Sequence, residues 1–343
     1  MGVRMQYQLL GRSGVRASRI ALGTALLGLA PSGPDAEKLV HAAIDHGINV
    51  FDCANTYGNR PAFDRPGLPP ASERRYAEEV LGEALRGRRD DVLVCTKVGE
   101  PVGDGVNDGG LTIPGQVNTG GGLSRFHIMR EVDRSLTRLG TDHIDIYHLH
   151  HPDPDTPILE TLDTLDSLVQ QGKIRYVGLS DHLGWQMTQA VMVADSHSLP
   201  RPILNQIHYN MISRGPEVEV VPAASELGVS LTCFSPLAGG ALAGAEVLDR
   251  SHAGMKRFGV PFAFTDTQRR VAVELSGLAR RWGVAPAHLA MQWLWSRPGV
   301  ATAIIGPESV DELDSAVEAF GVTLDAEQFA ELDSVGRVDI DPW

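Results

Sequence analysis

Residues 47–58 read GINVFDCANTYG, and this stretch decides the fold because a short apolar segment in it ends at a carboxylate. Residues 47–51 are mostly apolar with a glycine in front, as expected of a buried parallel strand. Asp52 closes the predicted strand Val50–Asp52, and Tyr57 follows five residues later. Taken alone, the pair is more simply explained as a capping aspartate and a surface tyrosine, because both are common in turns. Only the surrounding strands can decide between a site and a turn.

The same unit, a short apolar run followed by a helical pattern, recurs along the chain. Helices are predicted at 35–45, 73–86, 127–139 and 158–171. The eight predicted strands are 20–24, 50–52, 92–96, 144–149, 175–179, 203–207, 230–234 and 302–305. Eight such units in 343 residues predict an α/β fold, a (β/α)8 TIM barrel. An open doubly wound sheet would want a GxGxxG turn after its first strand, and residues 23–28 do not supply one.

Two further features complete the predicted architecture. Extended runs at 7–10 and 15–20 flank the turn 11–14 and predict an N-terminal β-hairpin. No linker interrupts the series, so residues 1–343 are expected to form a single domain. The loops 58–71 and 99–122 are longer than a barrel needs, and they could be lids that close on substrate. They are expected at the carboxyl-terminal face of the barrel.

Composition excludes several classes of function. The net charge is −13 with a pI near 5.3 and no cluster of basic residues, so nucleic acid is not expected as a partner. The longest mostly apolar run, 20–30, is too short to span a bilayer, and the N-terminus lacks the apolar core of a signal peptide. We therefore expect a cytoplasmic protein without membrane partners. Three scattered cysteines predict neither a disulfide nor a zinc framework.

In a TIM barrel the active site lies at the carboxyl ends of the strands, so the residues that close the predicted strands are the candidates. They are Thr24, Asp52, Lys97, His150, Ser180, Gln206 and Phe234. Lys97 stands out because only four of the 30 Lys and Arg residues are lysines. A lysine in an arginine-rich chain indicates a role for a compact, titratable ammonium. The alternative is a lysine that simply faces solvent.

His148, His150 and His151 offer a second reading of the fourth strand. His148 and His150 point to the same side of that strand and could bind a metal ion. A metal site needs three or four ligands, and no further cluster of ligating residues is evident in the sequence. We therefore predict no metal site.

Five motifs, taken in order, resemble the aldo-keto reductase family, and in particular its bacterial sugar and aldehyde oxidoreductases. They are FDCANTYG at 51–58, TKVG at 96–99, IDIYHLHHPDP at 144–154, GLSDH at 178–182 and FSPLAGG at 234–240. The similarity runs from the hairpin to about Phe320. It implies an enzyme that transfers a hydride between a nicotinamide cofactor and a carbonyl or hydroxyl carbon.

The resemblance implies a catalytic tetrad of Asp52, Tyr57, Lys97 and His150. An unperturbed tyrosine, with a pKa of about 10, is a reluctant proton donor and a poor base near neutrality. Lys97 beside Tyr57 would favour the phenolate, and Asp52 would hold the ammonium in place. Neutral His150 would orient the carbonyl oxygen or share the proton. Tyr57 is then the acid for reduction and the base for oxidation. By register with the family motif, His148 is an interior residue and His151 a rim residue.

The resemblance also implies a cofactor site without a Rossmann fold. Its expected residues are Gly23, Thr24, Ser180, Asp181, Gln206, Phe234, Ser235, Leu237, Gly239, Gly306, Glu308 and Glu312. Ser180, Asp181 and Gln206 would bind the nicotinamide amide, and Phe234 would stack on its ring. The family usually has Asn at position 181, whereas an ionised aspartate can only accept hydrogen bonds.

A second departure concerns the choice between NAD and NADP. Many family members place Lys or Arg after the eighth strand to pair with the 2′-phosphate of NADP, but no basic residue lies between Arg297 and Arg337. Glu308 stands there instead, followed by Asp311 and Glu312. A carboxylate suits a ribose hydroxyl, so we expect NAD to be preferred, with NADP possible. These acidic residues could also simply stabilise the N-terminal end of a helix.

The expected substrate is a small carbonyl or hydroxyl compound, sugar-like if Phe63, Trp185 and Trp343 line the pocket. NAD-linked oxidation of a sugar or polyol, or the reverse reduction, is the primary hypothesis. The alternatives are an NADPH-dependent aldehyde or keto-sugar reductase and a non-enzymatic partner subunit that senses the cofactor. A third is a lyase that forms a Schiff base through Lys97, which would need a lysine of depressed pKa.

Overall fold

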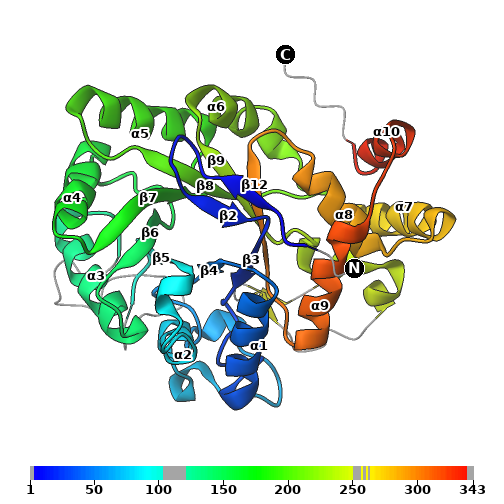
Figure 1. Cartoon of the computed structure of the whole chain (residues 1–343), viewed down its shortest axis with the longest axis horizontal. Coiled ribbons are helices and arrows are strands. Elements are labelled where there is room, and N and C mark those ends of the chain that lie inside the picture. The colour runs from blue at the N-terminus through cyan, green and yellow to red at the C-terminus, as the bar shows by residue number, and fades with distance from the viewer. Residues whose placement is uncertain (1–3, 103–120, 250–255, 258–259, 262, 338–343) are drawn as a thin grey trace.

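The computed structural model describes residues 4–102, 121–249, 256–257, 260–261 and 263–337. Eight parallel strands close into a barrel in the order β12-β3-β4-β5-β6-β7-β8-β9, so the predicted fold class is confirmed (Figure 1). The strands are β3 (Ile20–Gly23), β4 (Val50–Asp52), β5 (Leu93–Val98), β6 (Ile144–Leu149), β7 (Ile174–Ser180), β8 (Pro202–His208), β9 (Ser230–Phe234) and β12 (Val300–Ile305). All eight coincide with predicted strands, with ends that differ by two residues at most.

Helices surround the barrel and follow its strands (Figure 1). They are α1 (Gly33–Asp45), α2 (Ala77–Ala84), α3 (Arg125–Leu139), α4 (Ile158–Gln170), α5 (Gly184–His197), α6 (Val220–Leu227), α7 (Asp266–Trp282), α8 (Pro286–Trp295), α9 (Val310–Glu318) and α10 (Ala326–Ser334). The helix predicted at 73–86 is shorter, because residues 71–73 form a separate 3-10 turn ahead of α2. None of the described helices is long and apolar enough to cross a bilayer.

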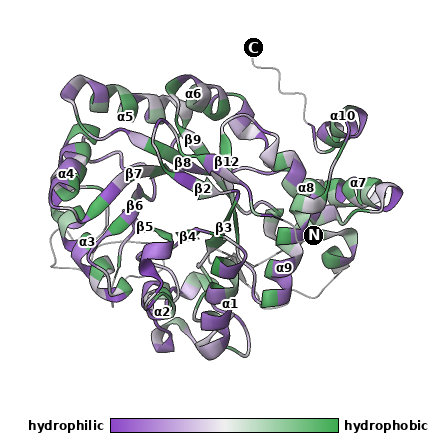
Figure 2. Cartoon of the chain, viewed as in Figure 1, coloured by the Kyte–Doolittle hydropathy of each residue, from purple (hydrophilic) through white to green (hydrophobic). Residues whose placement is uncertain are grey.

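Two apolar clusters form the core. The larger one lies between the barrel and the helices, which carry both hydrophobic and hydrophilic residues along their length (Figure 2). The smaller one fills the barrel itself and includes Leu10 and Ala17 of the hairpin together with Ala21, Val50 and Ile146 of the strands. Apolar packing therefore closes the amino-terminal end of the barrel. The polar chemistry is left to the carboxyl-terminal end.

The predicted N-terminal hairpin is present as β1 (Tyr7–Leu9) paired antiparallel with β2 (Arg16–Ser18). Its turn needs a glycine at position 11, where φ is +53° and an added Cβ would lie 2.4 Å from the carbonyl oxygen of Ile203. The residue after the hairpin ties it to the last strand, because Arg19 Nη1 donates to the Val300 carbonyl at 2.6 Å. The Trp295 indole N–H donates to the Arg19 carbonyl at 3.0 Å.

The loop after β4, residues 58–71, is held by one buried guanidinium. Arg74 donates to the carbonyl oxygens of Gly58, Pro69 and Arg60 at 2.7–2.8 Å, and it forms an ion pair with Asp64 at 2.7 Å. The 3-10 turn η1 (Pro61–Phe63) of this loop also contacts the short strand β10 (Lys256–Arg257), which pairs with β11 (Val260–Pro261). These contacts hold the loop in one position against the rest of the protein. The second expected lid, 99–122, falls largely outside the described residues, and the single domain over 1–343 stays a prediction.

Candidate active site

Asp52 and Lys97 meet at the mouth of the barrel because β4 and β5 are neighbours. The fully buried ammonium of Lys97 donates to Asp52 Oδ2 at 2.7 Å, to the Cys53 carbonyl at 2.8 Å and to the Tyr57 hydroxyl at 3.3 Å. β5 continues to Val98, one residue beyond the lysine, so Lys97 lies inside its strand rather than after it. All three protons of the ammonium thus have acceptors.

His150 follows β6 and completes the group. Its ring lies edge-on to the ring of Tyr57, with centroids 5.9 Å apart. The structure therefore brings all four predicted tetrad residues together. Phe63, which was expected in a substrate wall, also packs edge-on against Tyr57 at 6.4 Å.

Burial sets the protonation state of the two residues nearest the expected reaction. It raises the pKa of Tyr57 to about 12, although the charge of Lys97 works in the opposite direction. The expectation that Lys97 brings the phenolate within reach at neutral pH is thus outweighed by desolvation. Burial, with the charge of Lys97 added, also holds the pKa of His150 well below its usual range. The site presents a phenol and a neutral imidazole at pH 7.

The lysine keeps its charge despite complete burial. Desolvation disfavours the ammonium, but Asp52 and Tyr57 together raise the pKa of Lys97 above its ordinary value. A nucleophilic lysine for Schiff-base chemistry needs the opposite shift. The ion pair therefore speaks against the lyase alternative.

Gln206, which was expected to contact the cofactor, forms a hydrogen bond with Asp52. Its side-chain amide, from β8 on the far side of the barrel, donates to Asp52 Oδ1 at 2.7 Å. With Lys97 on Oδ2, both oxygens of the carboxylate have a donor. Its amide N–H is thus engaged inside the protein, which sequence reasoning did not foresee.

Other expected cofactor residues gather at the ends of β7 and β9. Ser180 closes β7, and Asp181 follows with φ +55°, a left-handed conformation uncommon for a non-glycine residue. Phe234 closes β9 and stacks on His208 with centroids 5.2 Å apart, and Ser235 after it has φ +52°. Non-glycine residues in this conformation cost free energy and concentrate at ligand sites. Asp181 and Ser235 are both among the residues that the resemblance assigns to the cofactor.

The remaining residues that were expected to bind the cofactor have different surroundings. An added Cβ at Gly23 would lie 2.8 Å from Ile304, so this glycine is explained by the packing of β3 on β12. Thr24 is buried, and its hydroxyl donates to the Asp52 carbonyl at 3.0 Å. Leu237 and Gly239 lie in the turn after β9, and Gly239 has φ +71°. At Gly306 an added Cβ would meet no heavy atom of the described residues within 4 Å.

The acids after β12 have partners that the local sequence did not reveal. Glu308 forms an ion pair with Arg65 of the loop after β4, at 2.8 Å. The Glu312 carboxylate accepts from the Glu308 amide at 2.9 Å. The Glu312 amide donates to the Ser309 hydroxyl at 3.2 Å, so Ser309 caps the start of α9. A basic group does reach this place, from a distant part of the chain.

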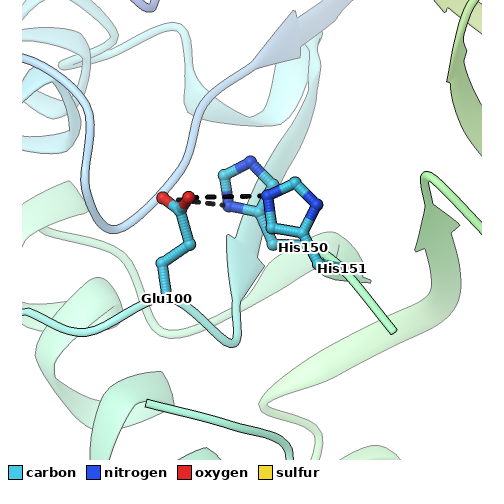
Figure 3. Close-up of side chains that lie close together, drawn as sticks. All are labelled: Glu100, His150 and His151. Carbon is cyan, nitrogen blue, oxygen red and sulfur yellow. Dashed lines mark ion pairs between the residues drawn. The ribbon is translucent and has the colours of Figure 1, made fainter. Parts of the chain in front are cut away.

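A group that sequence reasoning missed lies beside His150. Glu100, three residues after Lys97, accepts from the Thr56 hydroxyl at 2.7 Å and from Arg60 at 2.6 Å. Its carboxylate faces the stacked rings of His150 and His151 (Figure 3). Burial opposes its ionisation, but His151, His150 and Arg60 hold the pKa of the Glu100 carboxyl well below its usual range. Its position just past the end of β5 was the available signal.

His148 is buried inside the barrel, as expected. Gly178 on the neighbouring strand leaves room for it, because an added Cβ there would lie 2.5 Å from its ring. Burial, with a smaller effect of Lys97, lowers the pKa of His148 to about 4. Of the other aromatic residues expected around the substrate, Trp185 is 57% exposed at the start of α5, and Trp343 lies outside the described residues.

Comparison with known proteins finds relatives that match nearly the whole chain. The chain is 35% identical to "Uncharacterized oxidoreductase YrpG" of Bacillus subtilis over 94% of this chain and 93% of that protein. It is 34% identical to "Probable voltage-gated potassium channel subunit beta" of Oryza sativa subsp. japonica, over 93% and 92% of the two chains. It is 30% identical to "Protein tas" of Escherichia coli, over 97% and 98%. The model of the Aldo/keto reductase family matches residues 19–337, and the chain belongs to that family.

Proposed function

We propose that the chain transfers a hydride between a nicotinamide cofactor and the carbon of a carbonyl or hydroxyl group, with Tyr57 as the proton donor and acceptor. The observation that carries this proposal is the buried Lys97 ammonium, which bonds at once to Asp52 and to the Tyr57 hydroxyl. An ammonium there stabilises negative charge on the tyrosine oxygen as its proton leaves. Asp52, anchored by Gln206, keeps the ammonium in position.

The residues at the ends of β7, β9 and β12 fit the cofactor. Phe234 offers a flat ring, Ser180 and Asp181 offer polar atoms, and Gly306 leaves room for a ligand to approach the backbone. The bound cofactor would supply the hydride. Tyr57 would give its proton to the substrate oxygen as charge develops there, while neutral His150 donates a hydrogen bond to the same oxygen. A phenol that stays protonated supports reduction near neutral pH, and oxidation would need more alkaline conditions.

For the finer assignment we propose NAD as the preferred cofactor and a sugar or polyol-like compound as the substrate. Glu308 supports NAD, but Arg65 is a group with which a 2′-phosphate could pair, so the proposed preference is small. Aldehydes and keto-sugars with NADPH form the competing assignment. Similarity to a protein named as a channel subunit keeps a cofactor-sensing role as a second candidate.

The test measures binding and turnover separately. The purified chain is titrated with NADH and NADPH by protein fluorescence, and consumption of both is then followed with a panel of aldehydes, keto-sugars and polyols. Saturable binding with turnover that Tyr57→Phe abolishes supports the enzyme. Tight binding without turnover on any substrate class favours the sensing subunit, and absence of binding would overturn both.

A further inference from the structure

Glu100, His150 and His151 form a group of potential metal ligands at the mouth of the barrel (Figure 3). Their donor atoms all lie within 4.8 Å of one another. Nε2 of His151 is 3.4 Å from Oε1 of Glu100, and Nδ1 of His150 is 3.7 Å from Oε2. Among the residues that the structure describes, no other such group of three occurs.

We infer that this group is a binding site for a divalent transition-metal ion such as zinc, held by the two imidazoles and the carboxylate. In a tetrahedral zinc site with bonds of about 2.0–2.2 Å, neighbouring ligand atoms stand roughly 3.3–3.6 Å apart. Both carboxylate–imidazole separations come close to that value. The histidine nitrogens must approach each other, and His151, 48% exposed, can rotate to allow this.

A second observation in favour of a metal ion is the state of Nδ1 of His150. Among the residues that the structure describes, none forms a hydrogen bond with its buried Nδ1, although this atom faces the carboxylate of Glu100. A buried polar atom without a partner is costly, and such atoms call for an explanation by an unseen ion or water. An ion between His150 and Glu100 would satisfy it. Three protein ligands leave a fourth position for water.

The groups around the three ligands also fit a metal site. The opposite nitrogen of His151, Nδ1, lies 3.5 Å from Oδ2 of Asp181. A carboxylate behind a ligating histidine orients the ring and strengthens it as a ligand. This gives the aspartate at position 181 a use that an asparagine would serve less well. Arg60 opposes the metal, because its guanidinium shares the carboxylate of Glu100 at 2.6 Å.

Occupancy by zinc would affect the reaction. His150 would be fixed as a ligand, and two positive charges would be added near Lys97. We therefore expect zinc to inhibit turnover reversibly. This consequence rests on the proposed function, whereas zinc binding itself does not.

The experiment is equilibrium dialysis of the chelator-treated full chain against zinc at pH 7, with the wild type and four variants. Glu100→Gln and His151→Gln should each weaken binding at least tenfold. Arg60→Gln should tighten it several-fold, because the competing cation is gone. His143→Gln is the matched control: this histidine also contacts carboxylates, Asp142 at 2.7 Å and Asp145 at 3.8 Å, and its loss should change nothing.

X-ray absorption of the zinc-loaded protein should report nitrogen and oxygen ligands at about 2.0–2.2 Å, with two imidazoles. Weak binding that none of the four substitutions alters would overturn the site, as would tighter binding by Glu100→Gln. Circular dichroism checks that each variant is folded, and the exposed position of His151 makes that variant the safest. Zinc binding without turnover on any substrate would retain the site and reject the proposed function. Turnover without specific zinc binding would retain the proposed function and reject the zinc site.

Discussion

The side-chain amide of Gln206 donates to Oδ1 of Asp52 at 2.7 Å, so the carboxylate that holds Lys97 is itself held from the opposite side of the barrel. Gln206→Met removes that donor and leaves a buried, charged oxygen without a partner. We expect a loss of roughly 1–3 kcal/mol in the free energy of unfolding, together with lower turnover. Urea denaturation measures the first. Gln292→Met is the control, since its amide donates to the neutral Ala319 carbonyl, and it should cost less.

Tyr57→Phe should reduce turnover by about 10²–10⁴-fold, because the proton donor is lost while the ring remains. The affinity for NADH or NADPH, measured by fluorescence titration, should stay close to that of the wild type. Tyr76→Phe, which alters a tyrosine at the start of α2, should leave turnover unchanged. Retained turnover in the Tyr57 variant would remove this residue from the mechanism.

The raised pKa of Tyr57, about 12, predicts a different pH dependence for the two directions of the reaction. Below that value the phenol keeps its proton, so reduction should show no loss of turnover from tyrosine ionisation between pH 7 and pH 9. Oxidation needs the base form, and its rate should rise with pH across the same range. Parallel pH profiles of the two directions test this. A reduction profile that falls with an apparent pKa near 8 would contradict it.

Arg65 and Glu308 predict a cofactor-selectivity change. Glu308→Gln should free the guanidinium for the 2′-phosphate and raise the affinity for NADP relative to NAD by up to about fivefold, as expected of a partly exposed ion pair. Asp311→Asn removes a charge from the first turn of α9, just after Glu308, and leaves the ion pair between Arg65 and Glu308 in place, so it should change the ratio less. Equal effects of the two variants would show that the negative charge of this region, and not the ion pair with Arg65, determines the cofactor preference.

His182 predicts sensitivity to acid. Burial lowers its pKa to about 4, despite a hydrogen bond between Nδ1 and the Ser180 carbonyl. The folded pKa lies below the unfolded value of about 6.5, so the unfolded chain binds the proton more readily, and stability is lost as the pH falls from 6.5 towards 4. The cost between pH 7 and pH 5 is roughly 2 kcal/mol. His182→Gln should shrink this drop in urea denaturation, whereas the exposed His197→Gln should not.

The βα rhythm was enough to predict the barrel, and the polar residues at strand ends were enough to name Asp52, Lys97 and His150 as candidates. Tyr57 and the grouping of the four residues into a tetrad came from the resemblance to the family. Both signals are local: a strand end is visible in the order of residues, and parallel strands bring their ends together. The same reasoning placed Asp52, Lys97 and His150 at one edge before any contact was known.

Contacts between distant segments could not be predicted in this way. Arg65 reaches Glu308 because the loop after β4 crosses towards the loop after β12, and no spacing in either segment indicates it. The balance that keeps Tyr57 protonated depends on how deeply the ring is buried, which the sequence does not state. Glu100 was overlooked because a glutamate after a strand is usually a solvated side chain.

The hydrogen bonds of Arg19 with Val300 and Trp295 have a consequence for the synthesis of the chain. In the barrel, β3 has only two neighbours, β4 and β12, and β12 is made last. Until residues 300–305 emerge from the ribosome, the outer edges of β3 and β9 present unpaired amides and carbonyls, the pattern that other strands add to. A product that terminates before Val300 could not close its barrel. It would be expected to aggregate or to be captured by chaperones.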